Sequence, residues 1–150
     1  MRLALNAAGR IQGDNVNLKE QLIKHEGVRL RPYRCTAGKL TIGIGRNLDD
    51  VGISQEEALY LLDNDISKAT SALLQALPWV KDLDDARRNV LINMAFNLGI
   101  NGLLGFKNTL GLIEQGNYGA AAKQMLLSKW AMQVKDRAVE LSKIMESGVI

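Results

Sequence analysis

A long stretch of helical spacing, bounded by a start signal and a proline, constrains this chain most. Ser54 and Glu57 stand three residues apart, as in a capping box, where each side chain satisfies a free backbone N–H at the start of a helix. The spacing continues to Pro78, which cannot extend a helix because it lacks the backbone donor. About twenty residues at 1.5 Å each make a helix of about 30 Å, long enough to join two lobes. Its apolar positions are Leu59, Leu62, Ile66, Ala69 and Leu73.

The part of the chain after Pro78 carries further helical patterns, bounded by residues that cap or end helices. The predicted helices are 84–98, with Ala86, Val90, Met94 and Leu98 facing inward and Gly99 at its end, and 108–115, 117–128 and 134–146, with Asn108 and Asn117 as caps of the first two. This half of the chain is therefore predicted to be a helical lobe.

A shorter helix is predicted before the long one. Asn17 is placed to cap it, and Glu20 completes a capping box. Gly27 ends the helix, which puts Glu26 in its last turn. The apolar face of this helix consists of Leu18, Leu22 and Ile23.

Residues 28–45 lose helical spacing and indicate a small β element. The order of residues from Tyr33 to Gly45 predicts two short strands around a turn at Ala37 and Gly38. Gly43 and Gly45 remove side chains from one strand face, as close approach by a ligand or another segment requires. Together with the helices, this predicts an α+β fold that is mostly helical.

The size and composition fit one compact domain. The chain has 150 residues, of which 47% are hydrophobic and 23% charged, as in ordinary globular proteins. Residues 1–16 are weakly patterned and are interpreted as a tail or arm. Residues 17–150 are predicted to form the domain, with a small lobe at about 17–58 and a helical lobe at about 59–150. A groove between the lobes would suit an extended polymer.

The charge and cysteine content set loose limits on partners and location. A net charge of +3 favours polyanions in general, including nucleic acid, anionic membranes and bacterial cell walls. The single cysteine, Cys35, excludes an internal disulfide and is compatible with a reducing cytoplasm. The apolar stretch within residues 1–10 is too short for the core of a signal peptide. No other stretch approaches the roughly 18 apolar residues of a membrane-spanning helix. We therefore expect a cytoplasmic protein without stable membrane insertion.

Three side chains are candidates for chemistry, although each has a simpler explanation. Glu26, at a helix C-terminus, faces the negative end of the helix dipole, which favours a protonated acid; a surface glutamate is the simpler interpretation. Cys35 could act as nucleophile or base, or be a small buried hydrophobe. Thr41, on the return strand, could hold a water, or be present for β propensity. His25 is the only histidine and has no partner at metal-ligand spacing, so we expect no metal and no cofactor.

The run from Glu26 to Gly45 resembles the active-site segment of the phage lysozymes, of the T-even-phage and endolysin type. That family's pattern is a Glu, eight residues, an Asp or Cys, five residues, and a Thr leading into an Ile-Gly-x-Gly strand, and Glu26, Cys35 and Thr41 fit every position. The resemblance extends through most of residues 18–148. The later segments that resemble the family, in the same order along the chain, are Asp85–Arg88, Asn93–Gly99, Gly105–Leu110, Ser128–Trp130, and Arg137 with Ala138.

The resemblance implies a lysozyme-like fold of two lobes and a role for each matching residue. Glu26 would be the general acid, Cys35 would replace the commoner Asp as base or nucleophile, and Thr41 would position the water. Arg137 matches an arginine that lies near the catalytic Glu in relatives. The substrate-binding residues implied are Phe96, Thr109, Gln124 and Asn47.

Two departures from the family pattern are visible. Arg46 stands where the family usually has His, so a structural ion pair is expected between Arg46 and Asp65. The Cys in place of Asp leaves the stereochemistry open, because a sulfur nucleophile would allow a covalent intermediate and retention of configuration, whereas relatives with Asp are regarded as inverting.

The implied function is that of an endolysin-type muramidase, a bacteriolytic and antimicrobial hydrolase that cuts the β-1,4 bond between N-acetylmuramic acid and N-acetylglucosamine in peptidoglycan during host cell lysis. The resemblance implies a monomer, stored in the host cytoplasm, that depends on a holin to reach the wall. A catalytically impaired peptidoglycan-binding module and a lytic transglycosylase stay open as alternatives. A nucleic-acid-binding protein is disfavoured because no recognition motif is evident and positive charge is shared between the lobes.

Overall fold

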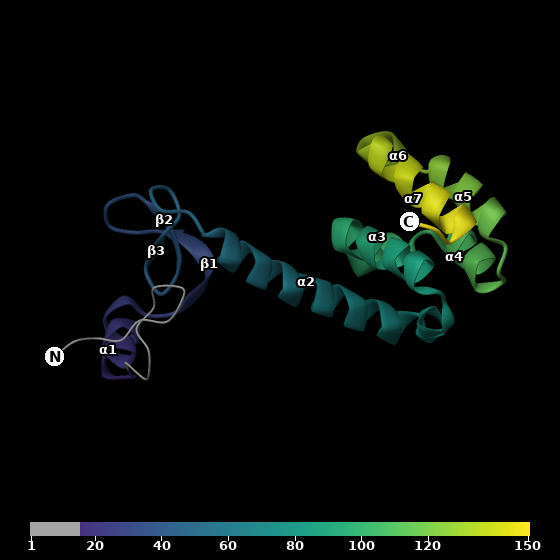
Figure 1. Cartoon of the computed structure of the whole chain (residues 1–150). Helices are drawn as coiled ribbons and strands as arrows, with labels where there is room; N and C mark the ends of the chain where they lie inside the picture. The colour runs from purple at the N-terminus through teal and green to yellow at the C-terminus, as the bar shows by residue number, and fades with distance from the viewer. Residues whose placement is uncertain (1–15) are drawn as a thin grey trace. The chain divides into compact units, whose positions relative to one another are not determined.

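The computed structural model describes residues 16–150, so the predicted arm at residues 1–16 lies almost wholly outside the described part. The chain divides into two compact units, residues 1–58 and residues 59–150. The first contains a helix and a small sheet, and the second is helical (Figure 1). The fold is α+β and mostly helical, as the sequence predicts.

Among the described residues before α2 (Gln55–Ala76), the first unit has one helix and a three-stranded antiparallel sheet of order β1-β2-β3. Its elements are α1 (Val16–Glu26), β1 (Arg29–Arg34), β2 (Leu40–Gly43) and β3 (Arg46–Asn47). Both predicted strands around the turn are present, and the third strand, β3, was not predicted because a strand of two residues leaves no periodic signal. Asn17 lies inside α1 and does not cap it, since the helix already includes Val16. The end of α1 at Glu26, before Gly27, confirms the predicted boundary.

A tight turn connects β1 to β2 where the sequence predicts it. Arg34 pairs with Leu40 in the sheet. Beyond this pair the Cys35 N–H donates to the Lys39 carbonyl at 3.0 Å, and the Gly38 N–H donates to the Cys35 carbonyl at 2.8 Å. These bonds place Cys35 at the entrance of the turn, opposite Lys39.

The long helix α2 (Gln55–Ala76) begins with the predicted capping box. The Ser54 N–H donates to Glu57 Oε1 at 2.9 Å, and the Glu57 N–H donates to Ser54 Oγ at 3.1 Å. Glu57 also forms an ion pair with Arg46, in which Arg46 Nη2 lies 2.7 Å from Glu57 Oε2 and Arg46 Nη1 donates to Glu57 Oε1 at 2.8 Å. The expected pair of Arg46 with Asp65 was therefore wrong. The capping box already fixes Glu57 beside β3, so the nearer carboxylate takes the guanidinium.

The second unit continues from α2 through the 3₁₀ helix Pro78–Asp82 into five α-helices. They are α3 (Asp85–Leu104), α4 (Lys107–Glu114), α5 (Tyr118–Leu126), α6 (Lys129–Val134) and α7 (Asp136–Ser147). Gly99, with φ 75° and ψ 159°, breaks α3 where the sequence predicts an end, but helical turns resume as far as Leu104.

Three sequence predictions in this unit need correction. Asn108 lies inside α4, which starts at Lys107, so it is no cap. Asn117 occupies the N-cap position of α5, but its side chain makes no capping bond. The predicted helices 117–128 and 134–146 leave out α6, whose start is capped by Ser128 Oγ accepting the Ala131 N–H at 3.1 Å.

The core of the second unit is built from side chains of every one of its α-helices, and α5 and α7 pack side by side within it (Figure 1). Each fully buried large apolar side chain contributes about 1.5–3 kcal/mol of transfer free energy. The largest of them are Leu73, Leu91, Met94, Leu103, Ile113, Met125 and Met145. Of the residues predicted to face inward from α3, Ala86, Val90 and Met94 are buried, and Leu98 is half-buried.

No single helix within residues 16–150 has both the length and the apolar character needed to cross a membrane. The pair α3 and α4 passes that test together, but the two are bent by 104° at their junction.

Arg87 ties the end of α7 to the start of α3. Its Nε donates to the Met145 carbonyl at 2.7 Å and its Nη2 to the Glu146 carbonyl at 2.8 Å, which satisfies two of the free carbonyls at a helix C-terminus. Its Nη1 lies 3.1 Å from Asp84 Oδ1, and the guanidinium lies 3.7 Å from the centre of the Tyr118 ring.

Arg87→Met is expected to lower the free energy of unfolding by about 1–3 kcal/mol, because it leaves two carbonyls without their donors while keeping the apolar stem. Urea denaturation followed by circular dichroism measures the change. Lys143→Met, at an exposed position of α7, is the control for replacing a cation by methionine. Equal unfolding midpoints for the two variants would contradict the role given to Arg87.

The Arg46 pair predicts a dependence of stability on pH. The hydrogen bond from Arg46, aided by the Ser54 N–H, lowers the pKa of Glu57 from 4.5 to about 2. A carboxyl whose pKa is lower in the folded state stabilises the fold above the unfolded pKa, and that contribution disappears as the pH falls from about 4.5 to about 2. Glu57→Gln is therefore expected to reduce the fall in Tm over this range, whereas the exposed control Glu140→Gln leaves it as in the wild type. Parallel Tm curves for wild type and Glu57→Gln would contradict this.

Candidate active site

Glu26 is held against the turn between β2 and β3. It is the last residue of α1, and the helix closes beneath it with the Gly27 N–H donating to the Ile23 carbonyl at 2.8 Å. Its side chain is exposed, and its carboxyl group lies so close to the backbone of Gly45 that a Cβ there would be 2.8 Å from Oε2. The first unit therefore supports this carboxyl from one side and leaves it accessible.

Cys35 occupies the mouth of the β1–β2 turn, where backbone N–H groups face its sulfur. The N–H groups of Lys39 and, next, Ala37 lower the pKa of the Cys35 thiol below its usual value, since they stabilise the thiolate. Partial burial works in the opposite direction, and the Thr41 hydroxyl adds a further lowering contribution. The turn thus provides a small cradle of donors for a negative sulfur.

Thr41 lies beside Cys35 on the returning strand. Its side chain is buried, with 4% of its surface exposed, and its Oγ1 donates to the Lys39 carbonyl at 2.9 Å. Because the hydroxyl carries one hydrogen, it donates either to that carbonyl or to the Cys35 sulfur at any moment. The structure therefore brings Cys35 and Thr41 together, and the strand of Thr41 leads into the turn that supports Glu26.

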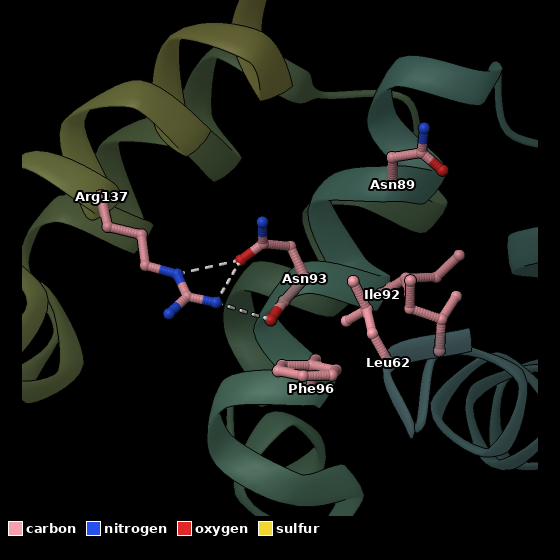
Figure 2. Close-up of a pocket in the computed structure, with 7 residues that line it drawn as sticks. Leu62, Asn89, Ile92, Asn93, Phe96 and Arg137 are labelled. Carbon is pink, nitrogen blue, oxygen red and sulfur yellow. Dashed lines mark hydrogen bonds between the residues drawn. The ribbon is translucent and has the colours of Figure 1, made fainter. Parts of the chain in front are cut away.

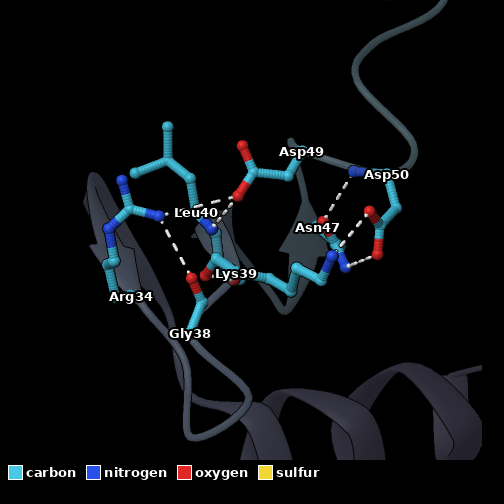
Figure 3. A network of polar contacts seen from close by, with 8 residues as sticks. Arg34, Gly38, Lys39, Leu40, Asn47, Asp49 and Asp50 are labelled. Atoms are coloured by element: carbon cyan, nitrogen blue, oxygen red, sulfur yellow. Dashed lines mark hydrogen bonds and ion pairs between the residues drawn. The ribbon is translucent and has the colours of Figure 1, made fainter.

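A network of polar contacts braces this turn (Figure 3). Arg34 Nη1 donates to the Gly38 carbonyl at 3.1 Å and lies 3.7 Å from Asp49 Oδ2. The same carboxylate oxygen accepts the Leu40 N–H at 2.8 Å. Lys39 Nζ lies 3.1 Å from Asp50 Oδ1. These contacts connect both sides of the Cys35 turn to the loop after β3.

Asn47, expected to bind substrate, is the last residue of β3 and is bonded to the loop that follows. Its Oδ1 accepts the Asp50 N–H at 2.9 Å, and its Nδ2 donates to Asp50 Oδ2 at 3.0 Å. Both polar ends of the side chain thus stabilise the loop after β3, and binding a sugar would require one of these bonds to open.

Phe96 and Arg137, also expected at the site, line one pocket of about 420 Å³ in the second unit (Figure 2). Arg137 points from α7 toward Asn93, with Nε at 3.0 Å and Nη2 at 2.7 Å from Asn93 Oδ1. The other lining residues are Leu62, Ile66, Asn89 and Ile92. The sequence reasoning missed Asn89 and Asn93 as lining residues, although their spacing with Phe96 marks one face of α3.

Thr109 and Gln124 come together in another pocket of the same unit, of about 380 Å³. Thr109 is buried and Gln124 is exposed. A neighbouring pocket of about 390 Å³ shares Gln124 and adds Gln115. The lining residues that sequence reasoning missed here include Lys107, Asn108 and Ser128, of which Lys107 and Asn108 line both pockets.

Within residues 16–150 no three side chains of the His, Cys, Asp and Glu types gather as metal ligands would. The groups in hand are a carboxyl on a helix end, a thiol among backbone donors and a buried hydroxyl. A carboxyl and a second basic group are what acid and base catalysis of glycoside cleavage requires.

Comparison with known proteins places these residues in a family. The sequence model of the family described as Phage lysozyme matches residues 23–143, a range that includes Glu26, Cys35, Thr41 and Arg137. "Probable T4-type lysozyme 1" of Dictyostelium discoideum is 31% identical over 89% of this chain and 96% of its own length. "Endolysin" of Acyrthosiphon pisum secondary endosymbiont phage 1 is 31% identical over 72% of this chain and 73% of its own length. "SAR-endolysin" of Escherichia phage Mu is 28% identical over 91% of this chain and 83% of its own length.

The match spans both units of the structure, from α1 to the last helix, and the first of these relatives is covered nearly end to end. The mostly helical α+β architecture agrees with it. The chain belongs to the phage lysozyme family.

Proposed function

We propose that this protein is an endolysin-type muramidase that hydrolyses the β-1,4 bond between N-acetylmuramic acid and N-acetylglucosamine in bacterial peptidoglycan, with Glu26, Cys35 and Thr41 as catalytic residues. Family membership supports the glycoside hydrolase activity. The observation that carries the assignment of residues is the β1–β2 turn, which sets the Cys35 sulfur beside the Thr41 hydroxyl on the strand leading to Glu26.

Glu26 acts as the general acid. Its carboxyl gives a proton to the glycosidic oxygen while the bond from that oxygen to the anomeric carbon breaks. Its exposure lets a polymer chain reach the carboxyl.

Cys35 serves as the basic partner, and Thr41 holds the water. In an inverting reaction the water attacks the anomeric carbon from the face opposite the leaving group, and its proton passes to the Cys35 thiolate. In a retaining reaction the sulfur itself bonds to that carbon, and a water activated by the Glu26 carboxylate then displaces it. The thiolate is the reactive form in both routes, so the backbone donors of the turn serve either one.

The second unit supplies binding surface for the polymer. The pocket of Thr109 and Gln124 offers hydroxyl and amide groups, which suit the hydroxyl and acetamido groups of amino sugars. Phe96 adds a half-exposed ring, and Arg137 adds a cation fixed by Asn93. The expected proximity of Arg137 to Glu26, and a groove between the lobes, stay predictions.

We further propose that the protein acts in host cell lysis as a monomer that accumulates in the host cytoplasm and reaches the wall after a holin permeabilises the membrane. The relatives named as endolysins support the cell wall as its substrate. Fractionation of induced cells with and without a holin, followed by assay of the wall, separates dependence on a holin from independent export.

The decisive variants are Glu26→Gln and Cys35→Ser. Each is expected to lower the rate of clearing of purified peptidoglycan by at least about a hundredfold, the scale expected for a positioned acid or base. Glu20→Gln, which changes an exposed glutamate on the same helix α1, is the matched control and should clear at the wild-type rate.

Each variant is first checked for folding by circular dichroism, and the products are analysed by mass spectrometry. Hydrolysis adds one water to each cut, whereas a lytic transglycosylase leaves anhydro ends. A full rate for Cys35→Ser would assign Cys35 to packing. A folded but inert wild type that still binds peptidoglycan would favour the impaired binding module.

The turn also predicts the titration of Cys35. Because backbone N–H groups stabilise its thiolate, the pKa of the thiol is expected below its usual 9.0, with the thiolate populated nearer neutral pH than in a free thiol. The rate of alkylation by iodoacetamide as a function of pH measures it. Thr41→Val removes one donor and should raise the midpoint, while the exposed Thr36→Val in the same turn is the control. An unchanged midpoint in Thr41→Val would contradict contact between the two side chains.

A further inference from the structure

The turn between β2 and β3 contains a glycine over which the Glu26 carboxyl is packed. A Cβ at Gly45 would lie 2.8 Å from Oε2, 2.9 Å from Cδ and 3.2 Å from Cγ of Glu26. The first two are well inside van der Waals contact for carbon against oxygen or carbon, so no side chain fits there without moving the carboxyl. The carboxyl group thus rests on the bare backbone of the turn.

Gly43, two residues earlier, differs in one respect. Both glycines have left-handed backbone angles, with φ of +71° at Gly43 and +73° at Gly45. A Cβ at Gly43 would meet nothing within 4 Å. Backbone conformation therefore accounts for both glycines, but close approach to another group accounts for Gly45 alone.

We propose that Gly45 is a positioning residue for Glu26. Its missing side chain lets the carboxyl settle on the β2–β3 turn, and this contact limits the rotamers of Glu26 and covers one side of the carboxyl. The proposal rests on the proposed role of Glu26 as the general acid. It adds that the direction of the acid is set by the sheet as well as by helix α1.

A physical consequence separates this role from a role in folding alone. An alanine at position 45 drives the carboxyl away from its resting place, and a displacement of about 1 Å at a reacting group costs roughly a hundredfold in rate. The sugar-binding residues of the second unit do not change, so kcat falls more than KM rises. An alanine at position 43 carries the same backbone strain and leaves the carboxyl where it is.

The first test measures Tm for Gly45→Ala and Gly43→Ala, each in the wild-type and the Glu26→Ala background. Any Tm loss at position 45 beyond that of Gly43→Ala should be small, because the displaced atoms are the far end of a flexible side chain, and Glu26→Ala should remove that excess but change nothing at position 43. The result that overturns the proposal is an excess Tm loss in Gly45→Ala that Glu26→Ala leaves unchanged. If Gly45→Ala does not fold, folding of Gly45→Ala with Glu26→Ala supports the proposal, and failure to fold in both backgrounds contradicts it.

The second test is the rate of cleavage of soluble peptidoglycan fragments. Gly45→Ala should lose at least about tenfold more kcat than Gly43→Ala, with KM changed less than kcat. Equal losses of kcat would overturn the proposal. Failure of this proposal can be told apart from failure of the proposed function. If Glu26→Gln is active, Glu26 is not the general acid. If Glu26→Gln is inactive but the effects of substitutions at positions 26 and 45 are independent, only the positioning role of Gly45 is contradicted.

Discussion

The register of one small antiparallel hairpin determines where the chemistry-bearing groups of the first unit lie. Arg34 opposite Leu40 and Tyr33 opposite Thr41 place Cys35 at the mouth of the turn and turn the Thr41 hydroxyl toward it. A slip of one residue would send Thr41 to the other face of the sheet, because side chains alternate along a strand. The same strand then leads through Gly43 to the turn that supports Glu26. Sheet pairing therefore decides which side chains lie beside the Cys35 thiol.

The proposed use of the Cys35 thiol as the basic partner makes a demand on the surrounding turn that a carboxyl would not make. A free thiol is mostly protonated near neutral pH, whereas a carboxyl is ionised there without help. The N–H groups of Lys39 and Ala37 lower the thiol pKa, and the contacts of Arg34 with Gly38 and Asp49 brace the loop that carries these donors. The polar network of the turn thus braces the segment whose backbone N–H groups lower the thiol pKa, as the proposed role of Cys35 requires.

The sequence predicts those parts of the fold that local signals specify. The capping box of Ser54 and Glu57, the end of α1 before Gly27 and the turn at Gly38 depend on residues close in the chain, and the structure has all three. Partners chosen by tertiary structure were not predictable in this way. Arg46 forms its ion pair with Glu57 and not with Asp65, because the start of α2 lies beside β3.

The candidate site shows the same division. The spacing of Glu26, Cys35 and Thr41 is a local pattern that the sequence alone reveals. The backbone N–H groups that face the Cys35 sulfur are visible only in the structure. The association of Asn93 with Arg137 joins residues 44 positions apart, so no local pattern announces it. The helix α6 escaped prediction since six residues are too few for a periodic signal.

Different interactions stabilise each of the two units internally, and the proposed catalytic groups all belong to the first unit. Within residues 17–58 Thr41 is the one buried side chain, whereas residues 59–150 share an extended apolar core. The first unit relies on sheet hydrogen bonds and on ion pairs, of which exposed ones such as Lys39 with Asp50 usually contribute no more than about 1 kcal/mol each. Segments with few buried apolar contacts open locally at lower free energy than the core does. The proposed acid and thiol therefore lie in the unit that has few buried side chains among its described residues, and the extended apolar core belongs to residues 59–150.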